Sequence, residues 1–170
     1  CQNPKLSSRL GRYPAFLSLT ERSDVQQVTQ DATFTGGWNA HAPMGQLLNE
    51  PSVKSALHNN ELMNTVWATV QDNLDDLRAY LKTGNSARYD PVKILGRWDL
   101  NVNVTLAMLR QARPNIPAPE MRTIRALWTQ AYAQTTFVAG SDNQAFLKNL
   151  PTFKPGQAPV TWTGTWKAND

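Results

Sequence analysis

The side chains that could perform acid–base or nucleophilic chemistry are few and scattered in this sequence. Its two histidines, His41 and His58, belong to no His-x-x-x-His or His-Glu pair, and its only cysteine is Cys1. The closest carboxylates, Asp75 and Asp76, are neighbours in a predicted helix, so their side chains point apart and suit its first turn. No Gly-x-Ser-x-Gly, Gly-x-Gly-x-x-Gly or phosphate-loop pattern is present. The sequence therefore predicts no catalytic residues, no metal site and no cofactor, and an enzyme is the least favoured class of function.

Cys1 points to a different kind of chemistry. A chain that begins at cysteine resembles a mature bacterial lipoprotein, in which the thiol carries a diacylglycerol and the amine is often acylated as well. Two or three such chains would hold the protein stably at a membrane, at about 0.8 kcal/mol per buried CH₂. The resemblance implies a cell-envelope location, periplasmic or at the outer membrane, and Gln2 fits the outer-membrane sorting pattern. The alternative is an arbitrary chain boundary at this residue.

The composition is that of a globular chain with a modest excess of positive charge. With 170 residues, of which 41% are hydrophobic and 18% charged, the chain can bury a core without disulfides. No apolar run approaches the roughly 18 residues that a membrane-spanning helix needs. Acids concentrate in residues 50–76 and bases in residues 77–125, which fits either two docking faces or two solvated faces. Nucleic acid is disfavoured as a partner, because the bases alternate with apolar residues and no nucleic-acid motif accompanies them.

The elements that would position these residues fall into three regions. Residues 1–44 contain frequent Pro and Gly without a sustained hydrophobic period, which predicts a lipid-anchored, irregular arm. Residues 45–90 have helical periodicity, with Met63 and Trp67 in one apolar stripe that predicts a buried helix face. Residues 91–170 change to strand-like alternation.

The clearest local pattern is the helix in "NLDDLRAYLKTG". Asn73 is expected to cap its start through the side chain, and Gly84 to end it. In the stripe that precedes it, truncation of Trp67 to Ala is expected to cost about 3–5 kcal/mol by leaving a cavity.

The last region predicts strands with helices inserted between the first strand and the others. "KILGRWDLN" has the alternation of a strand, and "VTLAMLRQA" and "PEMRTIRALWTQAYAQ" have the period of helices. "TTFVA", the turn "GSDN" and "QAFLKNL" predict a β-hairpin, and "APVTWTGTWKAN" predicts a final strand. The expected fold class is α+β, with an N-terminal helical region followed by an antiparallel sheet.

The order of these elements resembles the small lipocalin-like domains of bacterial lipoproteins. The resemblance covers residues 93–170 and rests on two Gly-x-Trp motifs, Gly96 with Trp98 and Gly164 with Trp166. It implies a partial, incomplete barrel, since only four candidate strands can be counted. Because a residue and the second one after it share a strand face, each Trp could fill the space beside its Gly and plug the barrel floor.

Besides an enzyme, two classes of function follow from these observations. The favoured one is a membrane-anchored, non-enzymatic accessory or scaffold lipoprotein with protein partners, for which a peripheral subunit of a larger membrane complex is one form. The alternative is a lipocalin-like binder of a small apolar ligand or lipid. Its pocket would be lined by Trp98, Phe137, Phe146 and Trp162. A cluster of basic residues could meet lipid headgroups, an acidic partner or solvent; it comprises Arg110, Arg113, Arg122 and Arg125.

Overall fold

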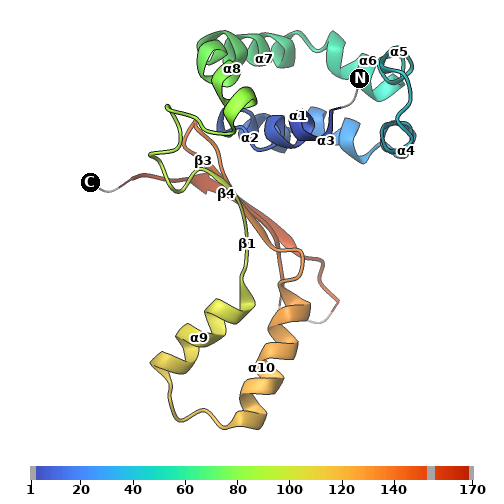
Figure 1. Cartoon of the computed structure of the whole chain (residues 1–170). Helices are drawn as coiled ribbons and strands as arrows, with labels where there is room; N and C mark the ends of the chain where they lie inside the picture. The colour runs from blue at the N-terminus through green and yellow to red at the C-terminus, as the bar shows by residue number, and fades with distance from the viewer. Residues whose placement is uncertain (1–2, 153–155, 169–170) are drawn as a thin grey trace. The chain divides into compact units, whose positions relative to one another are not determined.

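The computed structural model describes residues 3–152 and 156–168, and its chain forms two compact units (Figure 1). The first, which we call the helical unit, comprises residues 1–96 together with 140–142. The second, the sheet unit, comprises residues 97–139 and 143–170. The fold class is α+β with a partial, unclosed antiparallel sheet, as the sequence predicts.

Short helices follow one another through the helical unit, and their bounds are α1 (Pro4–Leu10), α2 (Pro14–Glu21), α3 (Ser23–Gln30), α4 (Ala32–Asn39), α5 (Met44–Leu47), α6 (Pro51–His58), α7 (Asn60–Asp72) and α8 (Leu74–Thr83). The expectation of an irregular arm over residues 1–44 is therefore wrong. Local signals start these helices: the Asn3 side chain accepts from two backbone N–H groups of α1, and Asp31 does the same for α4. Helices of seven or eight residues are too short to show a hydrophobic period, so they depend on packing.

The core of the helical unit joins α2 to α8 through aromatic rings. Tyr13 is fully buried, and its ring centroid lies 5.2 Å from that of Tyr80 and 5.6 Å from that of Tyr89. Ala15 and Leu77 complete the buried cluster. Because Tyr13 and Ala15 lie in the segment expected to be an arm, part of that segment belongs to a core.

Two expectations for α7 and α8 fail and one holds. Trp67 is 69% exposed, so it does not belong to a buried stripe and its truncation leaves no cavity. Asn73 occupies the N-cap position of α8 but makes no side-chain capping bond; its amide donates to Thr69 O at 2.8 Å, and its Oδ1 accepts from Tyr89. Gly84 ends α8 in the left-handed conformation with φ 88°, as predicted.

The sheet unit contains four strands in the order β1-β2-β3-β4. Two helices are inserted after the first strand, and the bounds are β1 (Gly96–Asp99), α9 (Val102–Ala112), α10 (Ala118–Ala131), β2 (Thr136–Ala139), β3 (Gln144–Leu150) and β4 (Val160–Thr165). The predicted strands, helices and hairpin are all present. The sheet is open, because β1 and β4 are its two edges.

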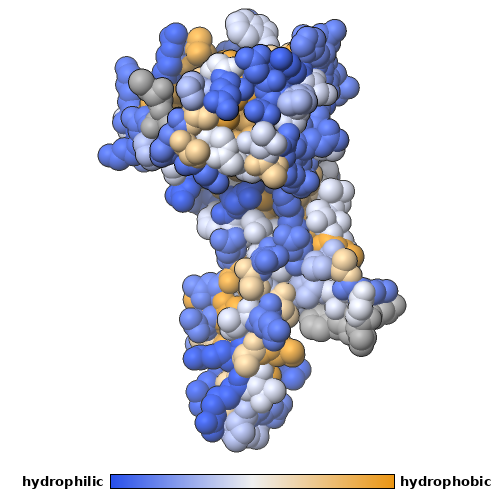
Figure 2. All heavy atoms as spheres, turned by 90° about the vertical axis from the view of Figure 1, so that its right-hand side faces the viewer, coloured by the Kyte–Doolittle hydropathy of each residue, from blue (hydrophilic) through white to orange (hydrophobic). Residues whose placement is uncertain are grey.

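The two inserted helices lie side by side as a hairpin (Figure 1). Apolar side chains reach the surface of this hairpin among polar ones (Figure 2), and Val104, Met108 and Leu127 are the large exposed ones. Among the described residues, no helix of either unit combines the length and the hydropathy that crossing a membrane requires.

Candidate functional site

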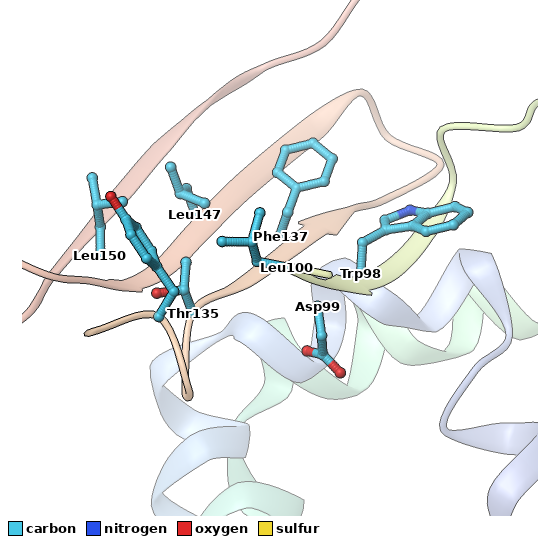
Figure 3. Close-up of a pocket in the computed structure, with 8 residues that line it drawn as sticks. Trp98, Asp99, Leu100, Thr135, Phe137, Leu147 and Leu150 are labelled. Atoms are coloured by element: carbon cyan, nitrogen blue, oxygen red, sulfur yellow. The ribbon is translucent and has the colours of Figure 1, made fainter. Parts of the chain in front are cut away.

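A row of apolar side chains crosses one face of the sheet. Phe137 on β2 pairs with Leu147 on β3, and Leu147 pairs in turn with Trp162 on β4. Directly paired residues project from the same face, so these three side chains are neighbours. Trp98 on β1 lines the same hollow as Phe137 and Leu147, and Figure 3 shows the three side chains on one side of the strands.

This face is hollowed in two adjoining places. The first hollow has a volume of about 280 Å³ and the second about 500 Å³, and both are lined by Tyr132 and Leu150. Since they share these residues, we treat them as one surface, the sheet groove. Its apolar lining consists of Trp98, Leu100, Tyr132, Phe137, Leu147, Leu150, Pro151, Val160 and Trp162.

A bulge in β3 brings Leu150 into the sheet groove. The register of β3 against β4 shifts between Leu147 and Leu150, and Asn149 has φ 53°. The Asn149 amide donates to Gln134 O at 3.1 Å, and Thr135 Oγ1 donates to Asn149 O at 2.9 Å. An extra residue reverses the alternation of a strand, so Leu150 lies opposite Val160 and on the face of Leu147.

On the opposite face of the sheet, a polar contact links β1 to β2. Thr136 Oγ1 donates to Asp99 Oδ1 at 3.1 Å, and Figure 3 shows the Asp99 carboxylate pointing away from the ring of Phe137. Because neighbouring residues alternate along a strand, this contact fits the placement of Trp98 on the groove side.

The structure brings together three of the four residues predicted to line a pocket. Trp98, Phe137 and Trp162 all belong to the sheet groove. Phe146 does not, because it pairs with Val138 and Thr163 and so projects from the opposite face. The sequence reasoning missed Leu147, whose pairing to Phe137 follows from the hairpin register.

The Gly-x-Trp motifs lie at opposite edges of the sheet, the first within β1 and the second at the end of β4. Gly96 has φ 142°, a conformation that favours glycine. The expectation that each Trp fills the space beside its Gly is wrong for the second motif, and the expectation that Trp98 plugs a barrel floor does not agree with its exposure. Trp98 is 50% exposed, and no atom lies within 4 Å of the position that a Cβ on Gly164 would take.

The chemistry of the sheet groove is apolar. Among the described residues that line its hollows, Asp99 and Tyr132 alone carry an acidic side chain and none is basic, and the Asp99 carboxylate contacts Thr136 on the opposite face. Within residues 3–152 and 156–168, no group of three or more His, Cys, Asp or Glu side chains is placed to hold a metal ion. Cys1 lies outside the described residues.

An acid with several strong contacts, Asp76, lies in the helical unit and lines neither hollow of the sheet groove. Asp76 Oδ2 accepts from Tyr13 Oη at 2.9 Å and from Ser86 Oγ at 2.6 Å, and its Oδ1 accepts from Arg88 N at 3.2 Å. Burial works against the charged carboxylate, but the hydrogen bonds from Ser86 and Tyr13 outweigh it and lower the pKa of Asp76. Tyr13 and Ser86 are almost fully buried, so this cluster stabilises the fold and offers no surface for a substrate.

The predicted basic cluster lies on the helical hairpin. Arg110 is in the last turn of α9, Arg113 follows it, and Arg122 and Arg125 are in α10; all four are exposed. No hydrogen bond or ion pair of these four side chains is described. Their exposure agrees with the expectation that the four guanidinium groups contact solvent.

Comparison with known proteins gives no relative: no family model matches the chain, and neither curated proteins nor solved structures contain a match. The resemblance to lipocalin-like domains of bacterial lipoproteins therefore stays a prediction. The proposed function is based on the sheet groove instead.

Proposed function

We propose that this protein is a non-enzymatic accessory or scaffold protein that docks an apolar segment of a protein partner in the sheet groove. The observation that carries the proposal is the exposure of two tryptophans on one sheet face: Trp98 is 50% and Trp162 64% exposed, with Phe137 and Leu147 on the same face. Covering such side chains is worth about 25 cal/mol per Å² of apolar surface. Trp and Tyr are also enriched among the residues that dominate protein–protein binding energies.

The openness of the sheet groove favours a protein partner over a small molecule. Ligand pockets typically enclose about 300–1,000 Å³ and bury most of the ligand surface. The first hollow, at about 280 Å³, lies just below that range. Its tryptophan is half exposed, which suits a surface that a partner covers.

A second candidate function is the binding of a small apolar ligand or lipid. The observation in its favour is that the larger hollow, about 500 Å³, continues from the first through Tyr132 and Leu150. Together the hollows offer an elongated apolar surface that an acyl chain could occupy.

The proposed location is the cell envelope, with acyl chains on Cys1 as the attachment. This part of the proposal rests on the resemblance of the N-terminal cysteine to that of bacterial lipoproteins. It is independent of the sheet groove and can fail without affecting the docking surface.

Site-specific photo-crosslinking tests the proposal. A photoreactive phenylalanine analogue replaces Trp98 in one variant and Trp67, which is exposed on the helical unit, in a control variant. We expect one defined protein adduct from position 98 that is absent from position 67. The same adducts from both positions, or a lipid adduct alone from position 98, would contradict docking of a protein in the groove; the lipid adduct would support the second candidate.

A further inference from the structure

The two edges of the sheet differ in how well they are protected against pairing with another strand. β1 is four residues long, and two of them, Arg97 and Asp99, are charged. β4 has six residues without a charge or a proline, and those from Thr161 to Thr165 are all exposed. Natural edge strands usually avoid intermolecular pairing through charge, proline or shortness. β4 has none of these features, so it is the edge open to another strand.

The sequence of β4 is complementary to itself when read in the opposite direction. Around Thr163, an antiparallel copy places Thr161 opposite Thr165 and Trp162 opposite Gly164. Threonine pairs across strands are stabilising, and an aromatic ring over a cross-strand glycine compensates for the missing side chain. We propose that two copies of this chain associate through β4, antiparallel, with a two-fold axis at Thr163.

The surface beside Gly164 has room for the indole of the second copy. No atom lies within 4 Å of the position of an added Cβ at Gly164, and its neighbour on β3 is Ala145. These two small residues leave a shallow strip beside Trp162, which is 64% exposed. In the proposed pairing each Trp162 covers the Gly164 of the other copy, so one side of each indole is removed from water while the groove side stays open.

The association would join the two sheets into one. The two rows that contain Phe137, Leu147 and Trp162 would lie on one continuous face, because a two-fold axis perpendicular to the sheet preserves the face. The threonines of both β4 strands would form a polar ladder on the other face. The inference concerns the edge of β4 and goes beyond the proposed function, which concerns the face of the sheet.

Sedimentation of the purified full-length chain tests the association. We expect the mass to rise with concentration toward twice 19.0 kDa in the wild type. Gly164→Val should remain monomeric, because the new side chain fills the strip that Trp162 of the other copy would occupy. This variant is expected to fold, since the space is empty and valine favours strands. Gly36→Val makes the same change at a glycine of α4 where an added Cβ also meets no atom, so it is the matched control and should still associate.

A wild type that stays monomeric at every concentration would overturn the proposal, and so would a Gly164→Val variant that associates as the wild type does. Trp98→Ala should keep the association while weakening a docked partner, which separates failure of this inference from failure of the proposed function.

Cysteine crosslinking tests the register and remains informative even if Gly164→Val does not fold. In a Cys1→Ser background, Thr163→Cys places the thiols of the two copies opposite each other at the axis. Cα atoms paired in this way lie within the distance that a disulfide spans. The Thr165→Cys thiol faces Thr161 of the other copy, and it lies too far from the Thr165→Cys thiol of that copy to form a disulfide. We expect a covalent dimer from Thr163→Cys and none from Thr165→Cys. Equal crosslinking of both variants, or none from Thr163→Cys, would overturn the proposed pairing.

Discussion

The hydroxyl of Tyr13 donates a hydrogen bond to Asp76 Oδ2 at 2.9 Å and so joins α2 to α8. Tyr13 is fully buried, and Ser86 donates to the same carboxylate oxygen at 2.6 Å. Asp76→Ala is expected to lower the free energy of unfolding by about 1–3 kcal/mol, because it leaves the two hydroxyls without their acceptor. Denaturant unfolding followed by circular dichroism measures the change. Asp75→Ala, at an exposed neighbour in the same helical turn, is the control and should change it little.

Acid is expected to destabilise the helical unit through Asp76. Its pKa in the folded chain lies below the ordinary value, so the unfolded chain takes up the proton first as the pH falls. The stability that Asp76 contributes is therefore present above about pH 4 and is lost as the pH falls further. Asp24, whose pKa is lowered chiefly by its hydrogen bond with Arg22, acts in the same direction. Asp76→Asn should have a shallower decline of stability below pH 4, with a residual part from Asp24. A slope equal to that of the wild type would contradict this role.

Alkali is expected to destabilise the same unit through Tyr13. Burial and the hydrogen bond to Asp76 raise the pKa of Tyr13 in the folded chain. The unfolded chain loses this proton near pH 10, so stability should fall as the pH rises above about 10. Tyr13→Phe should reduce the decline without removing it, because burial also raises the pKa of Tyr80. Thermal unfolding across this pH range measures the difference, and identical curves for the two proteins would contradict it.

The sequence predicts local elements here better than it predicts which faces are buried. The left-handed Gly84, the β2–β3 hairpin and both inserted helices carry their own signals in turn residues and hydrophobic period. Before residue 45, the signals are the capping side chains of α1 and α4 and the prolines that begin α1 and α2, which a search for periodicity overlooks. Leu62, Met63, Val66 and Trp67 recur at helical spacing in α7, yet of these four only Leu62 is buried. A period identifies a stripe, but the neighbouring helices decide how much of it they cover.

The candidate site was predictable up to the register between strands. Phe137 and Trp162 could be placed on strands from alternation alone. The face of Phe146 depends on the pairing across the hairpin. Val138, and not Phe137, lies opposite Phe146, so Phe146 projects from the other face. A shift of one residue in register moves every side chain of a strand to the other face. Leu150 was unpredictable for the same reason, since the bulge at Asn149 places it on the groove side.

The contrast between Trp67 and Leu62 gives a stability prediction on a single helix. Trp67→Ala should change the free energy of unfolding by no more than about 0.5 kcal/mol, because the side chain is exposed. Leu62→Ala should lower it by about 2–5 kcal/mol through a cavity in the core. Chemical denaturation of both variants decides the matter; a large loss for Trp67→Ala would show that its ring is covered in solution.

The bulge in β3 predicts a strong dependence on the residue at position 149. Asn149 has φ 53°, which glycine adopts freely and β-branched residues avoid. Asn149→Val is therefore expected to lower the free energy of unfolding by about 1–3 kcal/mol. Asn149→Gly, which keeps the backbone conformation but loses the bond to Gln134, should lower it less. Equal losses in the two variants would show that the backbone conformation is not the cause.

The lipid attachment proposed for Cys1 has its own direct check. Mass spectrometry of the N-terminal peptide from membranes of the producing cells should show the added mass of a diacylglycerol. An unmodified Cys1 thiol would contradict the proposed membrane attachment and would not affect the docking proposed for the sheet groove.

The sheet groove is the centre of the proposed function, and the affinity of the captured partner tests it most directly. The protein crosslinked from position 98 is purified, and its binding to the wild type, to Trp98→Ala and to Trp67→Ala is measured by calorimetry. We predict that Trp98→Ala weakens binding by at least about tenfold, a loss of about 1.4 kcal/mol, while Trp67→Ala binds as the wild type does. Equal affinity of Trp98→Ala and the wild type would contradict the assignment of this groove as the docking surface.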